Sequence, residues 1–222
     1  MSGTPSPDES APATDESGGA VPSTPPMTIS PVDLGPAARR MADLVATLPA
    51  DALGRPTPCE DYTVGDLLDH VAGAAAAFRA AAVKDPLPAA GPGDAANLAP
   101  DWQARLPGDV MALARAWDDP GAWTGTTAAG GVELPGAVAG IVALDELLLH
   151  GWDLARATGR AYDYDGPGLD IVFDQVTYFR SLGLEGIFGP EVPIPDDAPL
   201  FRRVLGVAGR DPDWQPPEGG EQ

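Results

Sequence analysis

The chain has 222 residues, of which 44% are hydrophobic, enough for one domain with a substantial core and extensions. With 13 basic and 33 acidic side chains its net charge is −20, which disfavours binding to phosphate backbones and to anionic lipid. No apolar run approaches the roughly 20 residues that cross a bilayer, and the N-terminus shows no signal peptide. Cys59 is the single cysteine. These features predict a cytoplasmic protein with no nucleic-acid or membrane partner.

The two ends of the chain differ in composition from its middle. Residues 1–30 are rich in Ser, Thr, Pro, Gly and acids and show no hydrophobic periodicity, so they are predicted to form a disordered tail. Residues 31–214 are predicted to form one domain, and residues 215–222 a second disordered tail. Met27 is an alternative start residue to Met1.

Helical spacing of apolar residues predicts the first two helices. The first extends from about Asp33 to Leu48, and the second from Thr63 to about Lys84. Thr63 is a candidate N-cap, because Asp66 follows three residues later as in a capping box. The loop between the two helices carries Cys59.

The middle of the chain contains the most apolar predicted helix. A third helix is expected over residues 101–118, with Pro107–Gly108 as a candidate break. The Gly- and Thr-rich segment 121–133 is predicted to be a loop with a strand-like edge, because it is too short for a sheet. The fourth helix begins near Pro135 and ends at Gly159, and its length and apolar character make it the predicted central helix.

Two shorter helices complete the predicted fold. They cover residues 168–184 and 200–208, and the tail from Gly186 is expected to pack over the other helices. No alternating strand pattern or solenoid repeat is visible. The prediction is therefore an all-α protein, an up-and-down four-helix bundle with short extra helical segments.

The fourth predicted helix carries a group of ionisable residues among leucines. Glu146, His150 and Asp153 share one face, since residues three and four apart stack on one side of a helix. His70, the only other histidine, lies on the second predicted helix and can point inward. Two imidazoles and a carboxylate suit zinc, or nickel, iron or manganese, with a position left open. Alternatively, both histidines are hydrogen-bonded core residues and Glu146–His150 is an intrahelical pair.

Several neighbouring residues have two readings. Asp153 and Asp69 are candidates to hold the second ring nitrogen of each histidine, although Asp153 could instead contact Arg156. Glu146 is either a metal ligand or a general base. Trp152 is expected in the core or a pocket wall, and Cys59 is expected to be a small buried residue because nothing nearby in sequence lowers its pKa. Arg156 and Arg160 close the helix, where cations are favoured.

Three segments resemble a known family. They are residues 56–71, residues 147–159 with the run H-G-W-D-L-A-R-A-T-G, and residues 198–212 with Ala-Pro-Leu and Gly-Arg-Asp-Pro. Together they resemble the DinB-like four-helix metalloproteins, and more closely the actinobacterial branch related to the N-terminal domain of mycothiol-dependent maleylpyruvate isomerase. The resemblance covers about residues 31–214. It implies the DinB-like fold and a metal triad at His70, Glu146 and His150; the family often has Trp where this chain has Tyr62.

The resemblance also implies a chemistry. It indicates a divalent metal ion, zinc first, and mycothiol as a cosubstrate for a transferase or isomerase acting on a small electrophile, with homodimerisation common in the family. The maleylpyruvate isomerases add a C-terminal domain with an arginine important for activity, and no such domain is seen here, so that particular isomerisation is not expected. The alternatives are a non-catalytic metal-binding or regulatory module of the same fold, and a helical interaction protein without metal.

Overall fold

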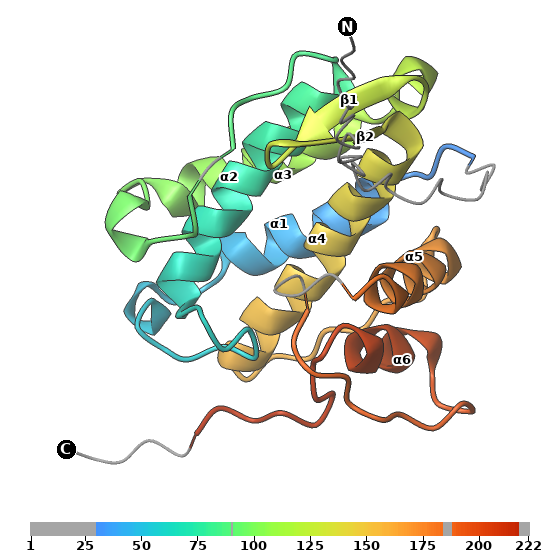
Figure 1. Ribbon diagram of the computed structural model, residues 1–222. Coiled ribbons are helices and arrows are strands. Elements are labelled where there is room, and N and C mark those ends of the chain that lie inside the picture. The colour runs from blue at the N-terminus through green and yellow to red at the C-terminus, as the bar shows by residue number, and fades with distance from the viewer. Residues whose placement is uncertain (1–29, 90, 184–187, 218–222) are drawn as a thin grey trace, which may run out of the picture.

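A computed structural model describes residues 30–89, 91–183 and 188–217 (Figure 1). The predicted N-terminal tail, apart from residue 30, and the last five residues of the predicted C-terminal tail lie outside this part. The elements are helices α1 (Gly35–Ala46), α2 (Val64–Ala82), α3 (Trp102–Ala116), α4 (Gly136–Ala157), α5 (Leu169–Ser181) and α6 (Leu200–Val207), the short 3-10 helices η1 (Ala50–Ala52), η2 (Ala95–Asn97) and η3 (Pro120–Trp123), and strands β1 (Thr126–Ala129) and β2 (Val132–Pro135).

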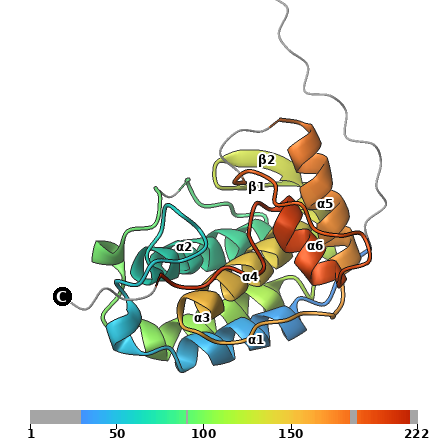
Figure 2. The same ribbon diagram turned by 90° about the horizontal axis from the view of Figure 1, so that it is seen from below.

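The fold is mostly helical, which confirms the main part of the fold-class prediction. Helix α1 packs against α3 and α4, and α2 packs against the same two helices. Helix α4 is the longest, with 22 residues, and also contacts α5. Helices α5 and α6 pack against each other to one side of α4 (Figures 1 and 2). The last two helices thus form a separate wall beside the first four.

One hydrophobic core joins these helices. In α4 most side chains are buried, which explains why its sequence is apolar nearly all round. Its largest buried aliphatic side chains, all with no exposed area, are those of Ile141, Leu144, Leu148 and Leu154. Within the described ranges, no helix combines the length and the apolar character needed to cross a membrane.

The predicted helix boundaries follow from local hydrogen bonds. At the start of α2 the Asp66 amide donates to Thr63 Oγ1 over 3.3 Å, and the Thr63 amide donates to Asp66 Oδ2 over 3.0 Å, which confirms a capping box. At the end of α4, Gly159 has φ +70°, a conformation that favours glycine. These two signals determine where α2 begins and where α4 ends. They therefore bound the helices that carry His70 and His150.

Residues 121–133 were predicted to form a loop with a strand-like edge, too short for a sheet, and the exclusion of a sheet is wrong. The segment contains most of η3 and most of an antiparallel hairpin, in which Ala129 pairs with Val132 across Gly130 and Gly131. Both glycines have positive φ, 58° and 81°, as a tight two-residue hairpin turn requires. The hairpin packs on α2 and α4, where the Thr127 hydroxyl donates to the Ala81 carbonyl over 2.7 Å.

The candidate break in the third helix is also wrong. Helix α3 continues through Pro107 and Gly108. A proline lacks the N–H that would bond to the preceding turn, which normally destabilises a helix interior. Here the apolar face of α3 offsets that loss, because Leu106 and Val110 on either side are buried in the core.

Candidate metal centre

Three candidate ligands, one on α2 and two on α4, meet between these two helices. Nε2 of His70, on α2, lies 3.1 Å from Oε2 of Glu146, and Nε2 of His150 lies 3.3 Å from the same oxygen. The two imidazole rings meet edge to face, with centroids 4.9 Å apart. All three ligand atoms lie within 4.8 Å of one another. The structure therefore brings together the triad that the sequence singled out across 76 positions.

These separations fit a divalent metal ion. In a tetrahedral zinc site with metal–ligand bonds of about 2.0–2.1 Å, adjacent ligand atoms are separated by about 3.3 Å. The two nitrogen–oxygen distances, 3.1 and 3.3 Å, agree with this geometry. Two imidazoles and one carboxylate also leave a coordination position for water or a substrate.

Both ring nitrogens of His150 face carboxylates. Nδ1 lies 3.1 Å from Asp153 Oδ2, while Nε2 faces Glu146. Burial alone would lower the pKa of His150, but hydrogen bonds to Asp153 and Glu146 outweigh burial and raise this pKa to about 9. Without a metal the ring is therefore doubly protonated near neutral pH. With a metal on Nε2, the Nδ1–H would still donate to Asp153.

The carboxylate of Glu146 is already in the form that binds a metal ion. Its burial alone would raise its pKa, but the hydrogen bonds and charges of His150 and His70 hold this pKa well below its usual range. Glu146 is therefore ionised without any metal present. A divalent ion would replace the proton on Nε2 of His150 and not a proton on this carboxylate.

A buried ion pair supports the back of His150. Asp153 has no exposed area, and Arg210 donates to its carboxylate from Nη2 over 3.1 Å and from Nε over 3.4 Å. Although burial would raise the pKa of Asp153, the charge of Arg210 and the hydrogen bond with His150 together outweigh burial and lower this pKa. Asp153 therefore stays ionised and can accept the His150 Nδ1–H.

The turn after α6 places Arg210. Gly209 has φ +77°, its amide donates to the Gly206 carbonyl over 3.0 Å, and the Arg210 amide donates to the Leu205 carbonyl over 2.8 Å. This pair of bonds is a Schellman motif, which reverses the chain toward α4. A Cβ on residue 209 would also collide with the backbone of Gly189. The sequence analysis missed the role of Arg210, although a Gly-Arg pair just after a short helix was a usable signal.

The remaining predicted residues lie in other contacts. Asp69 accepts a hydrogen bond from the Asp94 amide over 3.0 Å, so the structure assigns its carboxylate to a loop. Arg156 donates to the Trp214 carbonyl, not to Asp153. Trp152 is buried in the core, as expected.

A cavity of about 490 Å³ adjoins the triad. His70, Glu146 and His150 line it, and the Tyr62 ring stacks on that of His70 with centroids 5.5 Å apart. The rest of its wall comes from four regions: the loop after η1, one face of α4, the end of α5 with the segment after it, and the turn after α6. An ion held by the triad would therefore be accessible to a small molecule in this cavity.

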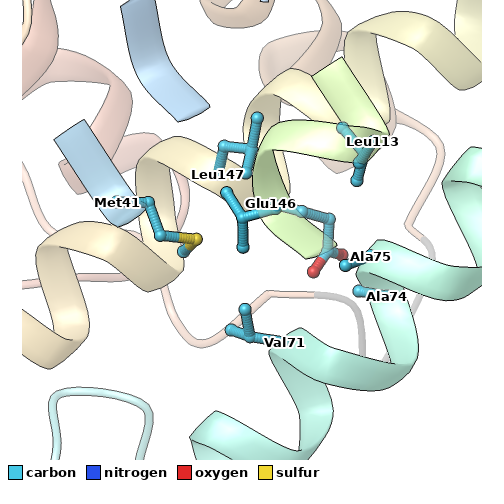
Figure 3. Close-up of a pocket in the computed structure, with 8 residues that line it drawn as sticks. Met41, Val71, Ala74, Ala75, Leu113, Glu146 and Leu147 are labelled. Carbon is cyan, nitrogen blue, oxygen red and sulfur yellow. The ribbon is translucent and has the colours of Figure 1, made fainter. Parts of the chain in front are cut away.

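Glu146 also touches a much smaller cavity in the apolar interior. This cavity has about 10 Å³, room for at most one water molecule. Figure 3 shows the Glu146 carboxylate beside the small side chains of Ala74 and Ala75, with Val71 and Leu113 nearby. The carboxylate therefore lies at the boundary between the hydrophobic core and the large cavity.

A second set of side chains could hold a metal ion, but its chemistry is less suitable. Cys59, His150 and Asp153 also have ligand atoms within 4.8 Å of one another. Burial, and then the charge of Asp153, raise the pKa of the Cys59 thiol to about 11, so the thiolate ligand is disfavoured. The Asp153 carboxylate is already paired with Arg210, whose positive charge opposes a cation there. Of the two sets, the one with His70, Glu146 and His150 is therefore chemically the better suited to a divalent ion.

Comparison with known proteins gives the chain a family. The model for the mycothiol maleylpyruvate isomerase N-terminal domain matches residues 34–155, a range that includes all three triad residues. Two uncharacterised proteins, from two strains of Mycobacterium tuberculosis, are each 32% identical over 161 residues, which cover 72% of this chain and 83% of the relative. No solved structure matches the chain. Arg210 lies outside the matched range, and Asp153 lies inside it. The chain belongs to the mycothiol maleylpyruvate isomerase N-terminal domain family.

Proposed function

We propose that this protein binds a divalent metal ion through His70, Glu146 and His150 and uses it in a thiol-dependent transfer or isomerisation of a small electrophile. The observation that carries the proposal is the convergence of three ligand atoms at the wall of a cavity large enough for a small molecule. Zinc is the first candidate, and nickel, iron and manganese suit the same ligands.

The chain's own residues would divide the work. His70 and His150 would bind the ion as neutral imidazoles, and Glu146 as a carboxylate. Asp153, held by Arg210, would fix the ring orientation and the tautomer of His150. The ion, when bound, would stabilise a thiolate near neutral pH.

A small-molecule thiol fits this site better than a nucleophile from the chain. The only cysteine, Cys59, lines the cavity but has a raised pKa, so it is a poor thiolate. The reacting sulfur would therefore come from a dissociable thiol. The description of the family supports mycothiol as that thiol.

We also propose that α1–α4 form the DinB-like up-and-down four-helix bundle. Their contacts support this arrangement, because α1 packs on α3, α3 on α2, α2 on α4 and α4 on α1, which closes a ring. In this arrangement the metal ligands come from the adjacent pair α2 and α4.

Metal content of the purified protein, by mass spectrometry, tests the metal site. We expect about one ion per chain in the wild type, and loss of that ion in His150→Ala and Glu146→Ala. Glu133→Ala is the matched control, because Glu133 is exposed on β2 and does not line the cavity. Metal retained in His150→Ala, or absent from the wild type even after zinc or nickel is added, would refute the site.

Thiol binding then separates the enzyme from the alternative, a metal-binding module without turnover. In cobalt-substituted protein, a thiol that coordinates the ion should produce a sulfur-to-cobalt absorption band. An unchanged spectrum with mycothiol and with simple thiols, together with tight metal binding, would favour the non-catalytic module.

A further inference from the structure

One carboxyl group at the cavity has an oxygen without a hydrogen-bond partner among the residues that the structure describes. Asp145 lies on α4, lines the cavity and is 8% exposed. Its Oδ1 is buried and has no hydrogen-bond partner within the described ranges. Buried carboxylates without a partner are costly and rare in folded proteins, and each one requires an explanation. A donor that enters from the cavity would supply the missing interaction.

The position of Asp145 on α4 connects it to the rest of the cavity wall. Val142 and Leu149 stand one helical turn before and after Asp145 and line the same cavity. Phe179 and Phe188 contribute aromatic surface to it. Asp145 is therefore a polar group set in an apolar wall, the usual composition of a site for a small organic ligand.

The charges around the cavity favour one class of ligand. The guanidinium of Arg210 is already committed to Asp153 and to the Ala208 carbonyl. The carboxyl groups that line the cavity are those of Glu60, Asp61, Asp145 and Glu146. Burial, and then the charge of Glu146, raise the pKa of Asp145 to about 7, so its carboxyl is mainly ionised at pH 8. A divalent ion at the triad would offset only part of this negative charge. An anionic ligand would therefore meet repulsion, whereas hydroxyl, amide or ammonium groups would find acceptors.

We propose that Asp145 recognises a hydrogen-bond donor on the ligand, and that the cavity selects thiols bearing hydroxyl, amide or ammonium groups over thiols bearing carboxylates. This inference rests on the proposed function, because it takes the ligand to approach the same metal ion. It defines the substrate class as donor-rich and neutral or cationic. Asp145 is a recognition residue and has no part in holding the ion.

Three thiols with the same two-carbon chain test this selection. They are 2-aminoethanethiol, 2-mercaptoethanol and 3-mercaptopropionate, titrated into the cobalt-substituted protein at pH 8. We expect the ammonium thiol to bind more tightly than the carboxylate thiol. The three thiols differ in acidity, so their affinities are compared between the wild type and Asp145→Asn. We expect the substitution to reduce the preference for the ammonium thiol by on the order of tenfold.

A matched substitution controls for net charge. Asp174→Asn makes the same change at an exposed position of α5 that does not line the cavity, and it should leave the preference unchanged. If Asp145→Asn does not fold, Asp145→Ala removes the same acceptor. An unchanged preference in the Asp145 variant, or equal loss in the Asp174 variant, would overturn the proposal.

A second measurement tests ligand selection by Asp145 without relying on a thiol bound to the metal. If no thiol changes the cobalt spectrum, the proposed function fails, and sulfur-free analogues then decide the inference. Saturation-transfer NMR with propylamine, 1-propanol and propionate should show contact with the first two and weak contact with the third. Asp145→Asn should reduce the propylamine signal, and a signal equal to that of propionate in the wild type would contradict the selection.

Discussion

Two groups of charged side chains contact His150, one through Asp153 and one through Glu146. They differ in whether their charges are already balanced. The Asp153–Arg210 pair is buried and complete, because a permanent cation faces a permanent anion. In the His70–Glu146–His150 group the side chains of His70 and Glu146 are 28% and 26% exposed, and the group contains no permanent cation. Its two imidazole nitrogens face one carboxylate oxygen, and the negative charge of that carboxylate is balanced only by a proton or a metal ion. The first group is therefore structural support, and the second has the composition of a site that exchanges a proton for a metal ion.

The largest expected effect comes from breaking the complete pair. Arg210→Met would leave the fully buried Asp153 without its cation, and we expect a loss of about 3–5 kcal/mol in the free energy of unfolding. Urea denaturation of the metal-free protein measures this loss. The control is Arg202→Met, because Arg202 pairs with Asp213 at the exposed surface and such pairs contribute about 0–1 kcal/mol. Equal losses in both variants would show that the buried pair is not the stronger support.

The hydrogen bond between Asp153 and Nδ1 of His150 connects the two groups. Asp153→Asn replaces the charged acceptor of the His150 Nδ1–H with a neutral amide, so the affinity for zinc should fall about 10- to 100-fold. Competition with a chromophoric chelator measures it. Asp69→Asn, at the other aspartate predicted to support a histidine, should have little effect, because Asp69 accepts from the Asp94 amide. A larger loss in the Asp69 variant would reverse the assignment of the supporting carboxylate.

The pH dependence of metal binding sharpens the contrast. The pKa of His150 is raised from 6.5 to about 9, so its proton stabilises the metal-free fold below pH 6.5, and that contribution disappears as the pH rises through 9. A metal ion must displace this proton. The affinity for zinc should therefore increase by about tenfold per pH unit between pH 6.5 and 9. Titrations at pH 6.5, 7.5 and 8.5 check this, and a constant affinity above pH 7 would contradict it.

The smallest expected effect concerns the rival ligand set. Cys59→Ser should change the zinc affinity by less than about twofold, because a thiol with a raised pKa is a poor ligand. The same titration measures it. A loss comparable to that in His150→Ala would move the metal to Cys59, His150 and Asp153.

Local sequence signals predicted much of the fold. Thr63 with Asp66 marked the start of α2, and Gly159 marked the end of α4, since both act through neighbouring backbone groups. The hairpin was missed because its strands have four residues each and its signal is the pair Gly130–Gly131. Helix α3 tolerates Pro107 because of packing that no local pattern records.

The candidate site was predicted where its residues share a helix. Glu146, His150 and Asp153 are grouped by spacing alone, and His70 joined them because histidines are rare here. Arg210 was not assigned, because its partner Asp153 lies 57 positions away and local spacing indicates only the turn after α6, not the residue that it meets. Asp145 was overlooked, although an acid in an apolar stretch of helix is itself a signal that the residue is functional.

Zinc-edge X-ray absorption of the zinc-loaded protein determines whether His70, Glu146 and His150 hold the metal ion. We predict nitrogen and oxygen ligands at about 2.0–2.1 Å, including two imidazoles, and no sulfur in the metal-loaded, thiol-free protein. A sulfur ligand at about 2.3 Å, or only one imidazole, would contradict the assignment. In that case Cys59 and Asp153 would replace His70 and Glu146 as the ligands beside His150.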